Sequence, residues 1–366
     1  MNDTDISQAL AETVRNAATT RTPLAILGSG SKRFLTGDIK GTPLDVTGHR
    51  GIVSYEPTEL VITARAGTSL AEIEAALSEK NQMLAFEPPH FADRIEARGA
   101  GQGGPGCAFG PKATLGGTIA CNLSGPRRPY AGSARDFILG TKIINGKGEI
   151  LKFGGQVMKN VAGYDVSRLM AGSFGTLGVI LEVSLKVLPK PAQEITLTFE
   201  MNANAAIAKM NTWAGQPLPL SAAAHAGDTL YIRLSGAESS VRAARTRLGG
   251  EPLAKGVAFW GELREHQRSF FKTETPLWRL SVPPASAPIN LPGKWLLDWG
   301  GAQRWLLTDT AAENIHRMAE SAGGYAMLFR TSQARAAKNA ELPEPARLLQ
   351  KNIKQSMDPA GILNPG

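Results

Sequence analysis

The hydrophobic and polar positions of the N-terminal half predict two amphipathic helices. The first is predicted over residues 5–18, where apolar side chains recur at helical spacing. The second is predicted over residues 70–80. It follows Thr68 and Ser69, whose hydroxyls suit the start of a helix because they accept hydrogen bonds from its first backbone N–H groups.

Short apolar and β-branched runs lie between and after these helices. They predict strands at residues 23–27, 44–47, 52–55, 60–66, 137–145, 149–153 and 179–187. Residues 87–113 are rich in proline and glycine and have no period, so they are predicted to form a loop.

The C-terminal half interleaves strands with helices, which is typical of an α+β domain with an antiparallel sheet. Strands are predicted at residues 194–200, 229–234, 277–282, 294–298 and 326–330. Helices are predicted at residues 205–213, 239–248, 262–271, 311–322 and 345–357. Pro189 and Pro191 separate the two halves, so a domain boundary is expected near residue 190.

Glycine and tryptophan are unevenly distributed, and this supports the same boundary. Of the 40 glycines, 19 lie between Gly99 and Gly178, whereas all six tryptophans follow residue 200. The tryptophans are expected to be core or subunit-contact residues, with a surface facing a ligand ring as the alternative.

Composition excludes several classes of protein. The 42% hydrophobic and 20% charged content suits a globular chain, and no apolar run is long enough to cross a membrane. The N-terminus lacks the pattern of a signal peptide, and two cysteines cannot hold an iron–sulfur cluster, so a reducing cytoplasm is expected. The net charge of +8 forms no basic stripe, so no nucleic-acid partner is expected.

Residues 28–32, Gly-Ser-Gly-Ser-Lys, follow an apolar strand and form the first candidate ligand site. Backbone N–H groups of such a turn can cradle a phosphate. Two known phosphate motifs do not fit, because a dinucleotide fingerprint needs glycine where Arg33 stands and a P-loop needs a different order of glycine, lysine and serine. An ordinary tight turn is the equal alternative.

Two further glycine motifs follow. The first runs from Thr114 to Gly125, where paired glycines allow a backbone to approach a bulky ligand and neutral polar side chains can place its polar edges. It continues through residues 130–140. The second, residues 172–178, is another glycine turn that leads into a strand.

Taken in order, these motifs resemble the vanillyl-alcohol-oxidase/PCMH family of FAD-binding domains over residues 20–190. The segments EPPHF, TIACNLSGPRRPYAGSARDFILG and FGGQVMKNVAGYDVSRLMAGSFGTLG are similar to the FAD-binding subunits of bacterial glycolate oxidase (glycolate dehydrogenase). The closing MDPAGILNPG resembles the end of the wider oxidase group.

The resemblance implies which positions hold FAD. The pyrophosphate would lie against Gly28, Ser29, Gly30, Ser31 and Lys32. The flavin and diphosphate would be lined by Thr114, Leu115, Gly116, Gly117, Thr118, Asn122, Ser124 and Gly125, and this wall would continue through Tyr130, Gly132 and Asp136. Gly178 and Val179 would offer backbone groups to the adenine or ribitol end.

The resemblance also implies the architecture. Residues 1–190 would form a PCMH-type FAD-binding domain of two α+β subdomains, and residues 191–330 an α+β cap domain with an antiparallel sheet. Residues 331–366 would form a helix and tail that return to the FAD domain. Residues 92–108 resemble an insertion, either a disordered excursion or a local lid or partner contact.

The residues give little support for a catalytic group or for a covalent link to FAD. No pair among the five histidines has metal-ligand spacing, so no metal is expected, and His90 is the weak candidate for a site role. His49 and His266 are expected to be solvated, and His225 structural. Serines occupy the first glycine loop, where covalent relatives use histidine or cysteine, so noncovalent FAD is expected and Cys121 is expected to be a packed residue.

Three functions stay open at this point. The first is an FAD-binding subunit of a multi-subunit glycolate oxidase, with a homologous FAD-containing catalytic subunit and an iron–sulfur subunit as partners, in the cytoplasm or at the cytoplasmic face of the inner membrane through the complex. The second is a stand-alone dehydrogenase of 2-hydroxy acids, in which Arg233 or Arg279 clamps a carboxylate unless these arginines lie on a solvated strand face. The third is an FAD-stabilised assembly subunit without catalysis.

Overall fold

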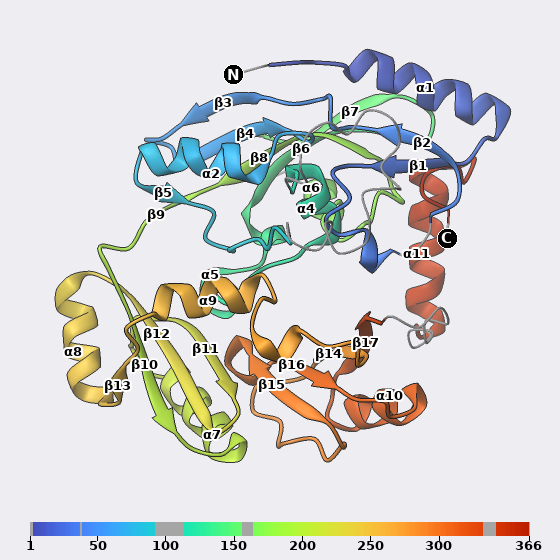
Figure 1. The fold of residues 1–366 in the computed structure, drawn as a ribbon. Coiled ribbons are helices and arrows are strands. Elements are labelled where there is room, and N and C mark those ends of the chain that lie inside the picture. The colour runs from blue at the N-terminus through green and yellow to red at the C-terminus, as the bar shows by residue number, and fades with distance from the viewer. Residues whose placement is uncertain (1–2, 37–38, 92–112, 156–163, 332–341, 366) are drawn as a thin grey trace. The chain divides into compact units, whose positions relative to one another are not determined.

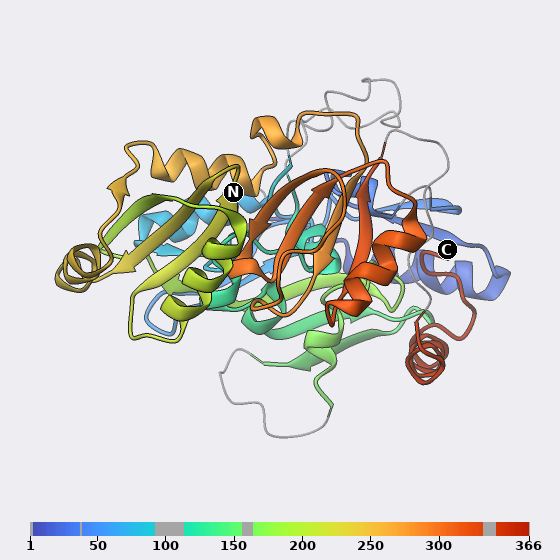
Figure 2. The same cartoon turned by 90° about the horizontal axis from the view of Figure 1, so that it is seen from below.

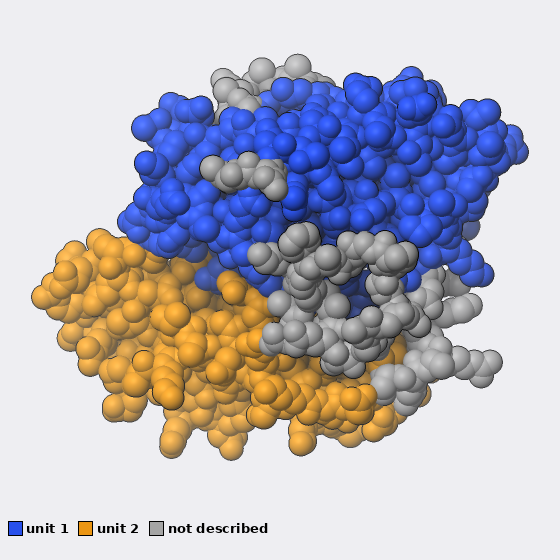
Figure 3. Space-filling view, turned by 45° about the horizontal axis from the view of Figure 1, so that its top comes forward, with its two compact units in different colours: residues 1–124, 132–190, 342–366 blue, residues 125–131, 191–341 orange. Residues whose placement is uncertain are grey.

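The structure is a computed structural model that describes residues 3–36, 39–91, 113–155, 164–331 and 342–365. The chain divides into two compact units, which Figure 3 shows in different colours. Unit 1 comprises residues 1–124, 132–190 and 342–366, and unit 2 comprises residues 125–131 and 191–341. The apparent insertion at residues 92–108 lies outside the described residues.

Unit 1 contains the strands that the first half of the sequence predicts (Figure 1). Its described strands are β1 (Leu24–Leu27), β2 (Thr42–Asp45), β3 (Ile52–Glu56), β4 (Val61–Arg65), β5 (Gln82–Met83), β6 (Ile138–Ile144), β7 (Ile150–Gly154), β8 (Val179–Lys186) and β9 (Leu188–Pro189). β1 and β2 pair in parallel, whereas β3-β4-β8-β6-β7 form an antiparallel sheet in that order and β5 pairs with β9.

The helices of unit 1 follow from local signals. They are α1 (Ser7–Thr20), α2 (Leu70–Glu79), α4 (Leu115–Cys121), α6 (Val166–Leu169) and α11 (Glu344–Met357), with short 3₁₀ turns at Arg33–Leu35 and Ala134–Phe137. The Ser69 side chain accepts a hydrogen bond from the backbone of Glu72, which confirms the predicted cap of α2. The apolar stripe of α1 packs against β1, β2 and the C-terminal tail.

Unit 2 is built on one antiparallel sheet in the order β13-β10-β12-β11-β15-β16-β14-β17. These strands are β10 (Gln193–Glu200), β11 (Leu220–Ala226), β12 (Thr229–Gly236), β13 (Glu251–Pro252), β14 (Leu277–Ser281), β15 (Lys294–Asp298), β16 (Gln303–Leu307) and β17 (Tyr325–Arg330). Its helices are α5 (Arg128–Ala131), α7 (Ala203–Ala214), α8 (Glu238–Leu248), α9 (Gly256–Arg264) and α10 (Ala312–Ser321), with 3₁₀ turns at Ser269–Phe271 and Trp299–Gly301. The predicted α+β class is confirmed.

Two apolar clusters hold one face of this sheet against helices. α7 and α8 pack on β10, β11 and β12, and α10 packs on β14, β16 and β17. Figure 2 looks onto the side that carries α7 and α10. α9 packs on the opposite face, where the indole N–H of Trp260 donates to Thr196 at 2.9 Å and Phe259 stacks on Tyr231.

In unit 2 the sequence misses two strands of five or more residues and displaces one helix, and in unit 1 it misses the helix α4. β11 reads LSAAAHA and β16 reads QRWLL, and neither has the β-branched pattern that marks a strand. α9 spans Gly256–Arg264 rather than the predicted residues 262–271, because the chain leaves the helix before His266, whose φ is +56°. Pairing with neighbouring strands, rather than local propensity, determines the two missed strands.

Residues 125–131 belong to unit 2, although the sequence places them in the range 1–190 of the expected FAD domain. Three contacts tie them to the sheet of unit 2. The Arg127 guanidinium lies 2.7 Å from the Glu194 carboxylate, the indole N–H of Trp299 donates to the Gly125 carbonyl at 3.0 Å, and Tyr130 packs beside the core of α7 and β12.

Several polar residues that were expected to be solvated are buried. His49 has no exposed surface, and His266 is stacked on Phe271 with ring centroids 3.9 Å apart. Arg233 is also buried, and its guanidinium donates to Ser221 and lies 3.8 Å from the Glu194 carboxylate. These expectations were wrong because neighbouring side chains in the sequence do not reveal contacts between distant segments. His225 is buried and bonded to the Met201 carbonyl, as expected of a structural histidine.

Five of the six tryptophans are buried, as expected of core residues. Trp295 is half-buried and packs beside the cluster that joins β14 and α10.

Candidate functional site

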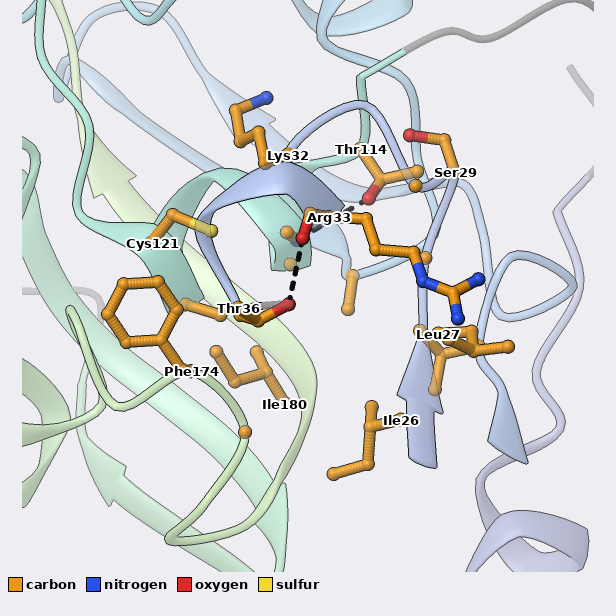
Figure 4. Close-up of a pocket in the computed structure, with 18 of the residues that line it drawn as sticks. Ile26, Leu27, Ser29, Lys32, Arg33, Thr36, Thr114, Cys121, Phe174 and Ile180 are labelled. Carbon is orange, nitrogen blue, oxygen red and sulfur yellow. Dashed lines mark hydrogen bonds between the residues drawn. The ribbon is translucent and has the colours of Figure 1, made fainter. Parts of the chain in front are cut away.

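The turn after β1 forms one wall of a pocket in unit 1 (Figure 4). The pocket encloses about 910 Å³ of empty space, with its open mouth included. The predicted residues that line it are Gly28, Ser29, Gly30, Ser31, Lys32, Thr114, Gly116, Gly117 and Gly178. Three motifs that are far apart in the sequence thus meet around one cavity.

The backbone of this turn is suited to an anion. Within the described part of the chain, the N–H groups of residues 28–31 donate to no acceptor. Gly30 has a φ of +79°, which glycine adopts without strain. At Gly28, an added Cβ would lie 2.9 Å from the hydroxyl of Thr114, so only glycine fits there. Consecutive N–H groups without acceptors are a ready site for phosphate oxygens.

Lys32 adds a positive charge at this end of the pocket. Its side chain is buried, and its Nζ lies 3.3 Å from the Ser31 hydroxyl. Figure 4 shows Ser29, Lys32 and Thr114 at one end of the cavity, while apolar side chains of Ile26, Phe174 and Ile180 lie at the other. The pocket therefore has a polar end and an apolar end.

α4 brings the second glycine motif to the cavity. Thr114 precedes the helix and accepts a hydrogen bond from the Gly117 N–H at 3.4 Å. Gly116 serves packing, because an added Cβ would lie 2.7 Å from the Cβ of Ala66. The helix can approach the end of β4 only with glycine at this position.

Cys121 lies at the end of α4 and lines the same pocket. Burial raises the pKa of its thiol to about 11, although the nearby Lys32 ammonium acts in the opposite direction. The thiol is neutral at neutral pH, as expected of a packed residue rather than a nucleophile.

The C-terminal tail supplies a pocket residue that the sequence reasoning did not assign to the site. The Asn364 amide accepts from the Ile26 N–H and donates to the Phe174 carbonyl, each at 2.7 Å. Its backbone N–H donates to the Leu24 carbonyl at 3.0 Å. Asn364 thereby joins β1 to the turn at residues 173–178, and the closing motif of the sequence was the available signal.

The remaining predicted residues do not line this pocket. Leu115, Thr118 and Val179 are buried in the interior of unit 1. Asn122 and Ser124 accept hydrogen bonds from the backbone of the 3₁₀ turn at Ala134–Phe137, and Asp136 accepts from the N–H and hydroxyl of Ser133. Gly132 has a φ of +108° next to this turn, and Gly125 and Tyr130 belong to unit 2.

His90 is not among the residues that line the pocket. Its Nε2 is 3.2 Å from the carboxylate of Glu74 on α2, so the two form an ion pair when His90 is protonated. Among the described residues, no group of histidine, cysteine and acidic side chains could hold a metal ion.

Comparison with known proteins supports FAD as the cofactor. The profile of the FAD binding domain family matches residues 6–95, which include the glycine turn. The glycolate oxidase subunit GlcE of Escherichia coli (strain K12) is 48% identical over 366 residues, which cover 100% of this chain and 98% of that protein. The chain belongs to the GlcE family.

Members of related families share shorter segments with this GlcE family protein. The glycolate oxidase subunit GlcD of Bacillus subtilis (strain 168) is 42% identical over 85 residues, 23% of this chain and 18% of that protein. A D-lactate dehydrogenase of Anaerostipes hadrus is 31% identical over 178 residues, 48% of this chain and 33% of that protein. FAD is the cofactor of this group, and its members are FAD-dependent oxidoreductases.

A solved structure supports the fold. Alkyldihydroxyacetonephosphate synthase superposes with a TM-score of 0.64 over 98% of this chain and 74% of its own, at 15% identity. In the described part of the GlcE family protein, no helix is long and apolar enough to cross a membrane.

The described residues fit FAD. Unpartnered backbone N–H groups and the Lys32 ammonium match the two charges of a pyrophosphate, and the apolar end matches a ring system.

Proposed function

We propose that this GlcE family protein is the FAD-binding subunit of a multi-subunit glycolate oxidase. It would take part in oxidising glycolate to glyoxylate and pass electrons to an iron–sulfur partner subunit. Two observations carry this proposal. The chain is 48% identical to the E. coli glycolate oxidase subunit along its whole length, and the pocket turn has four backbone N–H groups without an acceptor among the described residues.

In this proposal FAD is bound without a covalent link. When bound, FAD supplies an acceptor for the hydride of a 2-hydroxy acid. Residues 28–32 would hold the pyrophosphate, Gly117 would leave room beside it, and Asn364 would fix the two segments that border the apolar end.

Proton transfer from the substrate hydroxyl needs a base. None of the five histidines is among the residues that line the pocket, so we propose that the homologous FAD-containing catalytic subunit supplies this group. We place the complex in the cytoplasm or at the cytoplasmic face of the inner membrane. Two cysteines in the whole chain are too few for an iron–sulfur cluster, so the relay would come from a partner.

The test uses the purified full chain, alone and with its co-expressed partner subunits. Acid precipitation should release FAD into the supernatant, and anaerobic glycolate should bleach the flavin spectrum only in the complex. A Gly117→Trp variant should lose FAD, because a large ring would enter the pocket. The proposal is wrong if the complex containing this variant oxidises glycolate at the wild-type rate, since this chain would then serve only for assembly.

A second candidate is a stand-alone FAD-dependent dehydrogenase of 2-hydroxy acids. Arg279 favours it, because this half-buried arginine forms no hydrogen bond or ion pair among the described residues and its Nε is sealed from solvent. Bleaching of the isolated chain by glycolate would support this candidate over the first.

A further inference from the structure

His49 is a fully buried histidine in the loop that leads from the pocket residue Val46 to β3. Its Nδ1 accepts a hydrogen bond from the Ile6 N–H at 3.2 Å. A ring nitrogen that accepts carries no proton, so the neutral imidazole holds its proton on Nε2. The contact with Ile6 therefore exists only while His49 is neutral.

Residues 3–6, the N-terminal segment, lie against this loop and are held by few contacts. Thr4 and Arg50 exchange two backbone hydrogen bonds, at 2.9 and 3.1 Å, and the Asp3 carboxylate pairs with the Arg65 guanidinium. The first three residues of the segment are exposed. A segment with so few buried contacts opens at a lower free energy than the core does.

The charged groups around His49 come from the N-terminal segment and from three strands. They are Asp3 and Asp5 of the segment, Arg65 of β4, Lys142 of β6 and Glu182 of β8, and Arg50 follows His49 in the chain. Asp5 is the nearest that is measured, with its Oδ1 3.6 Å from Nδ1.

The closed N-terminal segment favours the neutral imidazole. Burial lowers the pKa of His49, and Lys142 acts in the same direction, while Asp5 and Glu182 oppose the shift. Burial outweighs the two carboxylates, so a protonated His49 is more stable where water can reach it. Protonation also places a hydrogen on Nδ1, where it faces the Ile6 N–H.

The backbone of His49 is joined to the wall of the FAD pocket. Its N–H donates to the Val46 carbonyl at 3.1 Å, and its carbonyl accepts from the Gly67 N–H at 2.8 Å. The Val46 N–H in turn donates at 2.9 Å to the carbonyl of Leu27, the residue before the glycine turn. Val46, Leu27 and Ala66 all line the pocket.

This loop packs tightly on Gly67. An added Cβ there would lie 2.6 Å from the Val46 carbonyl oxygen and 2.7 Å from those of Thr47 and His49. Because packed groups cannot shift singly, a displacement of His49 also displaces Val46. The position of His49 and the shape of the pocket are therefore coupled.

We propose that FAD binding to unit 1 is linked to deprotonation of His49. With His49 neutral, the N-terminal segment is closed and residues 46–49 hold the pocket wall in place. With His49 protonated, Nδ1–H and the Ile6 N–H are two opposed donors, and the segment opens. FAD binds the closed state more tightly and releases the proton to solvent.

The linkage is reciprocal, so protons weaken FAD binding by the factor by which FAD weakens proton binding. The pyrophosphate and the rings of FAD need no contact with His49 for this effect, because the pocket wall transmits it. The inference rests on the proposed function in taking FAD as the ligand of this pocket.

The experiment is titration of the full chain, stripped of FAD, with FAD at about pH 7.5 and 5.5, one unit to either side of the ordinary imidazole pKa. The Kd of the wild type should be about threefold higher at the lower pH, and at most about tenfold, the limit set by one unit below that pKa. His49→Gln keeps an acceptor for the Ile6 N–H and should bind FAD equally at both pH values.

His316→Gln is the matched control. It replaces a half-buried histidine of α10, in the unit that contributes no residue to the pocket, and should show the same rise in Kd as the wild type. The proposal fails if the Kd of the wild type is the same at both pH values, or if His49→Gln shows the wild-type rise.

The number of protons released tests the linkage on the wild type alone. Calorimetry at the lower pH, in two buffers with different ionisation enthalpies, should show release of a fraction of one proton per FAD, and no release would overturn the proposal. If His49→Gln does not fold, NMR of isotope-labelled histidine in the wild type takes its place. Saturation with FAD should move the titration of His49 to lower pH, and an unchanged titration would exclude the linkage.

Flavin bleaching separates this inference from the proposed function. If glycolate bleaches the complex but the Kd for FAD does not depend on pH, the linkage is wrong and the function stands. If FAD binding is linked to His49 but glycolate never bleaches the complex, the function is wrong and the linkage stands. A full chain that binds no FAD at the higher pH would overturn both.

Discussion

At the residue scale, the side chain of Asn364 bonds the backbone of two segments that are far apart in the sequence. Its amide satisfies the N–H of Ile26 and the carbonyl of Phe174, on the two segments that border the apolar end of the pocket. Asn364 has a φ of +41°, a conformation that asparagine tolerates better than most residues. The tail of the GlcE family protein is thus part of the site.

Asn364→Ala should lower the free energy of unfolding by about 1–3 kcal/mol, because a half-buried backbone N–H and a half-buried carbonyl lose their partner. FAD affinity should fall as well, since Ile26 and Phe174 line the pocket. Urea unfolding and fluorescence titration with FAD measure the two effects. Asn314→Ala, which removes an exposed amide from α10, should change neither. Unaltered FAD affinity in Asn364→Ala would contradict the role given to the tail.

His49 predicts a pH dependence of stability. Burial lowers the pKa of its imidazole below 6.5, although Asp5 and Glu182 oppose this shift and Lys142 supports it. The unfolded chain therefore takes up a proton more readily than the folded chain, and the free energy of unfolding falls as the pH drops from about 7 to 5. The lowered pKa of Asp5, which accepts hydrogen bonds from Ser7, affects stability only at lower pH.

His49→Gln keeps an acceptor for the Ile6 N–H but does not titrate. Its unfolding free energy should vary less between pH 7 and 5 than that of the wild type, in denaturant titrations at each pH. His90→Gln, at a partly exposed position, is the control and should follow the wild type. Identical pH profiles for wild type and His49→Gln would exclude His49 as the source.

At the element scale, α9 shows how contacts with a sheet set the position of a helix. Gly256 begins the helix where it crosses β10, and an added Cβ would lie 2.5 Å from the Thr196 hydroxyl. Gly261 lies in the same helix with no atom within 4 Å of an added Cβ. Packing against Thr196 therefore requires glycine at position 256, whereas the space around Gly261 would admit a side chain.

Gly256→Ala should destabilise the protein by about 1–3 kcal/mol because β10 and the helix must separate. Gly261→Ala should stabilise it by about 0.5–1 kcal/mol, since alanine loses less backbone entropy in a helix. Thermal and urea unfolding of both variants measure the signs. Equal effects of the two substitutions would show that α9 does not pack on Thr196 as described.

At the scale of the whole molecule, each unit has its own buried apolar clusters and its own sheets. Every residue that lines the glycine pocket belongs to unit 1. FAD should therefore stabilise unit 1 directly, by about 2.7 kcal/mol at a concentration of 100 times its Kd.

Hydrogen exchange followed by mass spectrometry should resolve this effect. Added FAD should slow exchange in β1, α4 and the tail more than in the strands β10, β12 and β14 of unit 2. The Gly117→Trp variant, measured with and without FAD, is the control and should show no protection. Protection of unit 2 alone would place the cofactor elsewhere.

Local sequence patterns were sufficient for much of the fold. The apolar period of α1, the serine cap of α2 and the β-branched runs of β6 and β8 are signals within a few residues, and they predicted these elements. The ordered glycine motifs were sufficient for the family and the cofactor, because close backbone approach needs glycine and leaves it at recognisable spacings.

Only the tertiary structure decided the features that depend on distant partners. β11 and β16 are strands because their neighbours pair with them, and His49, His266 and Arg233 are buried by segments far along the chain. The same holds for Asn364, which joins β1 from 338 residues away. It also holds for Arg279, whose Nε has no acceptor among the residues that the structure describes. Propensity and spacing act locally, whereas burial and hydrogen-bond satisfaction depend on the packing of the whole chain.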